Sequence, residues 1–125
     1  MNALGWFEIP AADFDRATRF YEQVLGVQMV REVFMGTPNA FFPYDRETGV
    51  GGSIIKMDDV APSASGTLVY LNAATPERLD EYLGRVEQAG GKVLVPQTHI
   101  GEAGHMAIFL DSEGNRVGLH APNVK

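Results

Sequence analysis

Residues 6–26 read WFEIPAADFDRATRFYEQVLG, and this stretch joins a strand pattern to a helix pattern. Asp13 is a favourable N-cap residue, and Gly26 stands where helices commonly end in a left-handed residue. Between them, apolar residues recur at the spacing of one helix face: Phe14, Ala17, Phe20, Tyr21, Val24 and Leu25. The stretch therefore predicts a strand over about 4–9 and an amphipathic helix that ends before Gly26.

Residues 68–91, LVYLNAATPERLDEYLGRVEQAGG, repeat this order. Thr75 is an N-cap residue, Pro76 suits the first helical position, and Glu77 suits the first turn. We expect this helix to stop at Gly90–Gly91, with a buried face made of Leu79, Tyr82, Leu83, Val86 and Ala89. Residues 6–11 overlay residues 68–73, so each half opens on a strand followed by a capped helix.

Strand patterns bounded by turn residues fill the rest of both halves. We expect strands at about 27–34, 38–44, 50–57, 66–72, 92–96, 104–110 and 115–120. Residues 45–47 with Gly51–Gly52 overlay 111–113 with Val117–Gly118, and the repeat period of about 62 to 66 residues is typical of a duplicated module rather than a solenoid.

The halves define a first module over about 3–60, a linker at 61–65 and a second module over about 66–122. Each module alone is too small to bury much apolar surface. The sequence therefore predicts a single α+β domain, in which two βαβββ modules join their strands into one cupped mixed sheet with the helices on its outer face.

Composition narrows the class of protein. The chain has 125 residues, is 45% hydrophobic, contains no cysteine and carries a formal net charge of −6. Disulfides and zinc–thiolate sites are therefore excluded, and scattered basic residues in an acidic chain argue against nucleic acid. No apolar run approaches the ~20 residues that span a bilayer, and three acidic residues near the start do not suit a signal peptide. We expect a cytoplasmic protein with no membrane partner.

Three separated motifs resemble the vicinal oxygen chelate superfamily, which includes glyoxalase, bleomycin-resistance and dioxygenase-like domains. Residues 7–13 with 20–26 resemble the opening strand and helix of that family, residues 89–93 the end of its second helix, and residues 109–120 its closing hairpin. The resemblance implies the duplicated βαβββ fold. It leaves the activity open, because the family contains isomerases, epimerases, dioxygenases, thiol transferases and non-enzymatic drug binders.

Glyoxalase-like members of this family hold a divalent metal in the cup with His, Glu or Gln from the first and last strand of each half. Carried over by motif, those positions fall in this sequence on Trp6, Gly52, Leu68 and Gly118. None of these side chains supplies the imidazole or carboxylate donors that such a metal needs. The resemblance therefore implies a member with no metal at the usual positions and no other cofactor.

Residues two apart on a strand share a face, which indicates what lines the cup. Trp6 and Glu8 should point the same way, as should His120 and Gly118. We expect the ligand-binding surface to comprise Trp6, Gly52, Leu68, Tyr70, Asn72 and Gly118. Trp6 and Tyr70 are able to stack on a planar or cationic ligand, although they also suit an ordinary core.

Two side chains are candidate catalytic residues. Glu8 beside Trp6 in an apolar cup would be desolvated, which suits a general base, but the same residue would be inert if it reached solvent at the strand edge. The imidazole of His120 suits acid–base work or ligand binding, or it could satisfy a backbone group.

The segment from His99 to His105 contains a further candidate cluster. His99, Glu102 and His105 form a set that could hold a displaced metal, together with His120, but they lack the i, i+4 spacing of helical zinc motifs. A solvated or lid-like loop is the alternative interpretation.

Three functional hypotheses follow. The first is a metal-independent protein that binds a small molecule, similar to bleomycin-resistance proteins, which work as homodimers with ligand grooves at the subunit boundary. The second is a divergent glyoxalase-related lyase or isomerase that uses Glu8 or His120 in proton transfer. The third is a metalloenzyme with displaced ligands. The acidic, aromatic composition is compatible with a cationic aromatic ligand.

Overall fold

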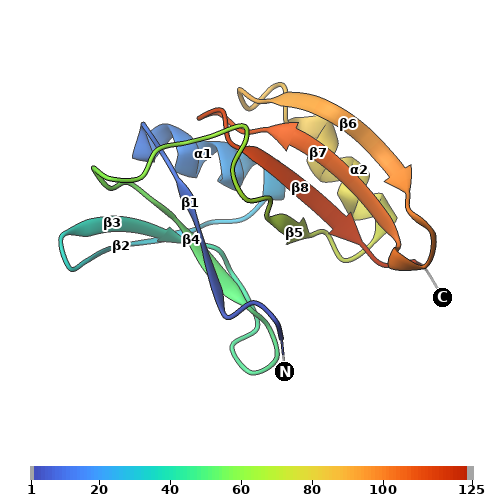
Figure 1. Ribbon diagram of the computed structural model, residues 1–125, viewed down its shortest axis with the longest axis horizontal. Coiled ribbons are helices and arrows are strands. Elements are labelled where there is room, and N and C mark those ends of the chain that lie inside the picture. Colours follow the sequence, from blue (N-terminus) through green and yellow to red (C-terminus); the bar gives the residue numbers. More distant parts are fainter. Residues whose placement is uncertain (1, 124–125) are drawn as a thin grey trace.

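The computed structural model describes residues 2–123, which fold as two consecutive βαβββ modules (Figure 1). The first module contains β1 (Trp6–Pro10), α1 (Phe14–Leu25), β2 (Val30–Phe34), β3 (Thr37–Phe41) and β4 (Gly51–Ile55). The second contains β5 (Tyr70–Asn72), α2 (Pro76–Arg85), β6 (Lys92–His99), the short 3-10 helix η1 (Gly101–Ala103), β7 (His105–Leu110) and β8 (Arg116–Ala121). The predicted fold class is confirmed. Among these residues, no helix has the length and apolar character needed to cross a membrane.

Helix α1 begins and ends where the sequence predicts. The Asp13 side chain accepts a hydrogen bond from the Arg16 N–H, and Gly26 has φ of 65°, a left-handed conformation that glycine adopts without strain. The buried residues of α1 lie on one face: Ala17, Thr18, Phe20, Tyr21 and Val24.

Helix α2 is shorter than predicted. Thr75 caps its N-terminus through a hydrogen bond from the Arg78 N–H, as expected, but the α-helix ends at Arg85 rather than before Gly90. Beyond it the chain continues in tighter turns, in which the N–H of Val86 bonds to the carbonyl of Leu83 and the N–H of Gly90 to that of Glu87. Val86, with φ of −59° and ψ of −49°, still has helical dihedral angles and reaches the core, so the apolar pattern continues from the α-helix into an irregular turn.

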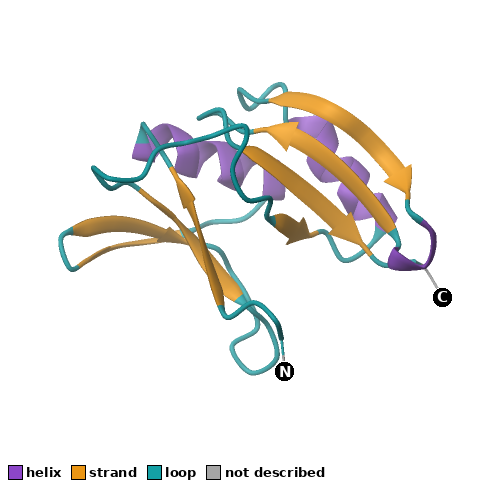
Figure 2. Cartoon of the chain, in the orientation of Figure 1, coloured by secondary structure: helices purple, strands orange, loops and turns teal. Residues whose placement is uncertain are grey.

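Each module makes its own four-stranded sheet within the described residues. The orders are β1-β4-β3-β2 and β5-β8-β7-β6, with β1–β4 and β5–β8 parallel and the other pairs antiparallel. The expected joining of the strands into one sheet is not found here, since residues 2–123 contain no ladder between the two sheets. Figure 2 shows the sheets side by side with both helices behind them.

The helix-covered faces join the modules in one core. The Tyr21 ring on α1 lies 5.4 Å from Phe42 of the first module and 6.4 Å from Phe109 of the second, between ring centroids. The guanidinium of Arg85, at the end of α2, donates to the carbonyl of Val24 at 3.1 Å. Because the apolar surface of both sheets is used in this shared core, the faces that the helices leave uncovered point outward.

The turn between β7 and β8 fastens the second module to the start of α1. The buried Tyr21 hydroxyl donates to Asp111 Oδ2 at 2.6 Å, and the Asn115 side-chain amide donates to the carbonyl of Pro10 at 2.7 Å. Burial, followed by the neighbouring Asp111 carboxylate, raises the pKa of Tyr21 well above 10.0, so that this phenol remains a donor. The turn therefore crosses from one module to the other through buried hydrogen bonds.

Glu113 completes this contact at the helix N-terminus. Its side chain has no exposed surface and accepts hydrogen bonds from the N–H groups of Ala12 and Asp13, at 3.0 and 2.7 Å, and from Arg16 Nε at 2.7 Å. Burial alone would raise the pKa of Glu113, but the hydrogen bonds from Arg16, Asp13 and Ser112 outweigh it and hold the pKa below its usual value of 4.5. The carboxylate also faces the positive end of α1.

Because the folded-state pKa of Glu113 is depressed, its contribution to stability should be complete above the unfolded-state value of 4.5 and should be lost as the pH falls through the folded-state pKa. We expect Glu113→Gln to lower the free energy of unfolding at pH 7 by about 2 kcal/mol, the typical scale of hydrogen bonds to a charged group. Urea unfolding at several pH values measures both effects.

Asp15→Asn is a control, because Asp15 pairs with Arg31 on the exposed surface, where ion pairs contribute little. Below pH 4.5, the free energy of unfolding of the wild type should fall more steeply with decreasing pH than that of Glu113→Gln. Equal slopes would contradict a stabilising role for the Glu113 carboxylate.

Candidate functional site

The helix-free face of the first sheet carries an open aromatic pocket. Trp6 and Glu8 lie on this face, in register with Gly51 and Ser53 of β4. A cavity of about 430 Å³ opens beside Trp6, which is the chain's only tryptophan. Trp6 is 41% exposed. We call this the Trp6 pocket; its lining includes Trp6, Val30, Glu32, Phe41, Tyr44 and Arg46.

The aromatic rings of the Trp6 pocket meet edge to face. The Trp6 centroid lies 6.0 Å from Phe41 and 6.3 Å from Tyr44, at interplanar angles of 63° and 80°. Such packing holds each ring by its edge and fixes the orientation of the indole, while part of its surface remains accessible. The arrangement can receive a flat apolar group or a cation over a ring face.

Charged and polar groups surround these rings. The Arg46 guanidinium lies 6.0 Å from the Tyr44 ring centroid, and the exposed carboxylates of Glu8 and Glu32 lie on the same sheet face as Trp6. Beside Glu8, the buried Ser53 hydroxyl donates to Asn39 Oδ1 at 2.9 Å, so these two polar groups satisfy one another. Glu8 itself is exposed, and the burial that the general-base hypothesis requires is not found in the single chain.

The candidates of the second module lie on the helix-free face of the other sheet. Tyr70 is 44% exposed, and its ring lies over Gly118, where any Cβ would collide with it. Asn72 Oδ1 accepts a hydrogen bond from the Ala74 N–H at 2.8 Å, and His120 Nε2 pairs with the carbonyl of Ala103 at 2.5 Å. His120 therefore satisfies a backbone group, one of the two roles that the sequence left open.

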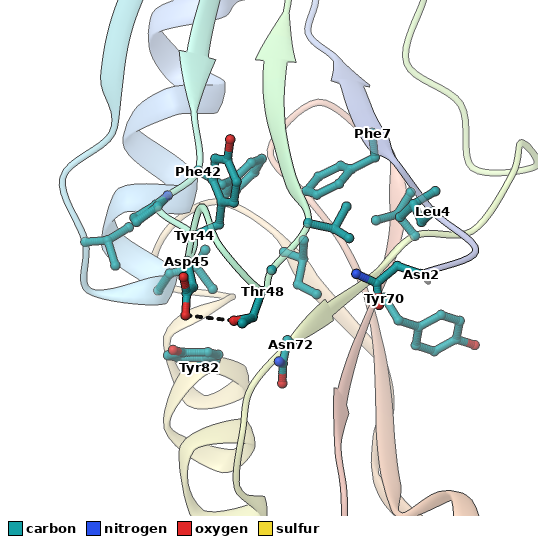
Figure 3. A pocket seen from close by; sticks show the side chains of 17 residues that line it. Asn2, Leu4, Phe7, Phe42, Tyr44, Asp45, Thr48, Tyr70, Asn72 and Tyr82 are labelled. Carbon is teal, nitrogen blue, oxygen red and sulfur yellow. Dashed lines mark hydrogen bonds between the residues drawn. The ribbon is translucent and has the colours of Figure 1, made fainter.

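A second, larger cavity of about 670 Å³ lies between the modules (Figure 3). Tyr70 and Asn72 line it, together with Phe7 and Tyr82, whereas Trp6 does not. Asp45 also lines this cavity, and the side-chain hydrogen bond from Thr48, together with the N–H of Glu47, holds the pKa of Asp45 below its usual 3.8. The single chain thus separates the predicted ligand-binding residues into two places, and Leu68 lines neither cavity.

The overlay of Gly52 on Gly118 is wrong by one residue. The N–H of Ala11 bonds to Ile55 and the N–H of Ala73 bonds to His120, each at 2.8 Å, which makes Ser53 the counterpart of Gly118. Gly52 instead lies opposite Phe7, with the Phe7 ring over it on the helix-covered side. The cause is the first-module loop, since Ser53 is eight positions after Asp45 whereas Gly118 is seven positions after Asp111.

With this correction, the residues that the family resemblance implies at the four metal positions become Trp6, Ser53, Leu68 and Gly118. They offer an indole, one neutral hydroxyl that already bonds to Asn39, an alkyl group and no side chain. This donor set does not fit a divalent metal ion, which needs converging imidazole or carboxylate ligands. Within residues 2–123, no three His, Cys, Asp or Glu side chains group around a common point for a metal, and His99, Glu102, His105 and His120 do not make such a set.

The alternation of side chains along the strands did not predict all the residues that line the Trp6 pocket. Phe41 and Glu32 lie on the same face as Trp6 because β3 and β2 follow β4 in the sheet, an order that the sequence pattern did not supply. Tyr44 and Arg46 lie in the loop after β3, where periodicity gives no direction for a side chain.

Alanine substitutions at the neighbouring glycines test which face each position occupies. In Gly51→Ala, the new Cβ would press on the Tyr44 ring beside Trp6, and we expect a shift in Trp6 fluorescence. In Gly52→Ala, it would press on Phe7 in the core, and we expect a loss of about 1–3 kcal/mol in unfolding free energy from overpacking, with Trp6 emission unchanged. A shift of Trp6 emission in Gly52→Ala but not in Gly51→Ala would show that Gly52 lies on the face of Trp6, as the sequence overlay predicted.

Comparisons with known proteins agree with this fold. The family model "Glyoxalase/Bleomycin resistance protein/Dioxygenase superfamily" matches residues 3–119, and the chain belongs to this superfamily. The family expectation is thereby confirmed. Among curated proteins, no sequence matches the chain.

Solved structures share the architecture at low identity. A glyoxalase/bleomycin resistance protein from Albidiferax ferrireducens T118 has a TM-score of 0.73 at 15% identity, covering 98% of this chain and all of that one. The fosfomycin resistance protein FosX from Listeria monocytogenes has a TM-score of 0.65 at 18% identity, covering 100% and 94%. A glyoxalase I mutant from Zea mays has 0.69 at 19% identity, and there the match covers 94% of this chain but only 46% of that one. At such identities these likenesses concern the fold alone.

Proposed function

We propose that this protein binds a planar, positively charged organic molecule in the Trp6 pocket and holds it without metal-dependent chemistry. The observation that carries the proposal is the half-exposed indole of Trp6, held at its edges by Phe41 and Tyr44 on the open face of a sheet. An exposed aromatic cluster of this kind leaves ring faces free for a ligand.

The charges around the pocket favour a cation. Glu8 and Glu32 place two carboxylates on the face of Trp6, and the chain as a whole carries a net charge of −6. A cation over the indole gains both from the ring quadrupole and from these carboxylates. Arg46 beside Tyr44 would be displaced outward or would bind an acidic substituent of the ligand.

Binding has more support than proton transfer. A lyase or isomerase would need a buried general base near the ligand, whereas Glu8 is exposed and His120 Nε2 is engaged with the carbonyl of Ala103. The Trp6 pocket therefore offers recognition groups but no positioned pair of acid and base.

We also infer that two copies of the chain associate, with the second-module sheet of one copy facing the Trp6 pocket of the other. Val33 is 74% exposed and Met35 90%, more apolar exposure than a hairpin of a monomer needs. Val33 lies on the opposite face of β2 from Trp6, whereas other exposed apolar side chains lie on or next to the helix-free faces: Leu4, Trp6, Val30, Phe34, Leu68 and Tyr70. This pairing would bring Tyr70 of one copy close to Trp6 of the other.

Because Trp6 is the only tryptophan, its fluorescence reports on this pocket alone. We expect 1-methylquinolinium to change Trp6 emission saturably at pH 7, and its neutral analogue quinoline to bind at least about fivefold more weakly, since the cation–π contribution is about 1 kcal/mol. Phe41→Leu should weaken binding of the cation by a similar factor by removing one ring.

Leu4→Ala is the matched control, because Leu4 lines the larger cavity between the modules and not the Trp6 pocket. Weakening by Leu4→Ala but not by Phe41→Leu would move the site to the larger cavity. A linear, unsaturable quenching would show collision without binding and would contradict the proposal.

Leu68→Glu should weaken self-association about tenfold or more, because it would place a carboxylate in the apolar interface. Gln23→Glu adds the same charge to an exposed position of α1 and should leave association unchanged. Sedimentation velocity over a concentration series measures both, and a wild-type chain that is monomeric throughout would refute the dimer.

A further inference from the structure

The chain's three histidines all lie near one end of the second sheet, but only two of them face each other. His99 on β6 is directly opposite His105 on β7, and their ring centroids are 4.9 Å apart at an interplanar angle of 50°. His120 is opposite Met106, the neighbour of His105, and therefore lies on the other face of the sheet. The pair is separate from both the Trp6 pocket and the four family metal positions.

The backbone between the two imidazoles is held in a tight connection. The N–H of Ile100 bonds to the carbonyl of Gly104 at 2.8 Å, and Gly101 and Gly104 have φ of 74° and 106°, which favour glycine. From outside the hairpin, the Asn123 amide donates to the Gly101 carbonyl at 2.9 Å while its Oδ1 lies 3.1 Å from His99 Nε2. The connection fixes both strands on either side of the imidazole pair.

We propose that His99 and His105 form a bidentate site for a borderline divalent transition metal ion, Cu²⁺ in preference to Zn²⁺. Two imidazoles that share one metal at about 2.0–2.1 Å have ring centroids roughly 5 Å apart, and the observed centroid separation of 4.9 Å is close to this value. Nitrogen donors select copper, nickel or zinc over magnesium or calcium, and copper binds most strongly in that series.

Asn123 Oδ1 accepts a hydrogen bond from His99 Nε2–H, which leaves His99 Nδ1 free to bind the metal and fixes the orientation of the ring, and water would complete the coordination. Because residues 2–123 place no third His, Cys, Asp or Glu at the pair, the site would bind a metal that can exchange with solution, in contrast to a closed structural zinc site. A bound ion would also link β6 to β7 on either side of η1. The last residue of η1, Ala103, is hydrogen-bonded through its carbonyl to His120.

Isothermal titration of untagged protein with CuCl₂ tests the site. We expect one Cu²⁺ per chain, weakened about tenfold or more by His99→Ala or by His105→Ala, since each removes one of two strong ligands. His120→Ala is the matched control and should change the affinity by no more than about twofold, because its ring lies on the opposite face.

A measurement on the unmodified chain makes the test independent of how the variants fold. The three histidines give three sets of imidazole proton signals, and substoichiometric Cu²⁺ should broaden those of His99 and His105 before those of His120. Uniform broadening, undiminished binding in the His99→Ala, His105→Ala double variant, or a loss in His120→Ala as large as in the other two would overturn the proposal. The Trp6 titration with 1-methylquinolinium reads a different module and does not depend on this result.

Discussion

The carboxylate of Glu113 is the constraint on which the relation between the two modules depends. It comes from the turn between β7 and β8, yet its acceptor atoms are filled by the backbone at the start of α1 and by Arg16. A covered carboxylate without those donors would carry a large desolvation cost. The second module is therefore fixed against the first through the N–H groups that immediately precede α1, and Asp111 with Tyr21 extends the contact into the core.

That attachment determines which surfaces remain for function. With α1 fixed between Phe42 and Phe109, the helix-covered faces of both sheets meet in one core. The helix-free faces then belong to two separate sheets, and Trp6 and Tyr70 line different cavities in a single chain. In the proposal, a second copy of the chain would supply the surface that completes the cup, which is the physical reason that self-association and ligand binding belong together there.

The sequence predicted the modules well because each opens on strong local signals. Asp13, Gly26, Thr75 and Pro76 are capping residues whose effect depends on neighbours in the chain, and both helices begin where those residues place them. The site was harder to predict because it depends on register. One extra residue in the loop after Asp45 moved Gly52 to the opposite face from Trp6, and no periodicity within β4 distinguishes the two alternatives, since all five of its residues are buried. The separation of the sheets depends on Glu113, whose distant partners no local pattern reveals.

Replacing a metal by an indole changes how the same cup obtains affinity. A metal ion supplies one strong, directional interaction, so the residues around it need only select the substituents of the ligand. In the proposed binding site, with Trp6 and Leu68 at two of the positions that the family resemblance implies and Ser53 bonded to Asn39 at a third, recognition would come from area and ring contacts distributed over the face. Such contacts tolerate different ligands of similar shape, because stacking discriminates weakly between one flat ring system and another. The charges of Glu8 and Glu32, rather than the aromatic rings, would then decide which flat molecule this surface retains.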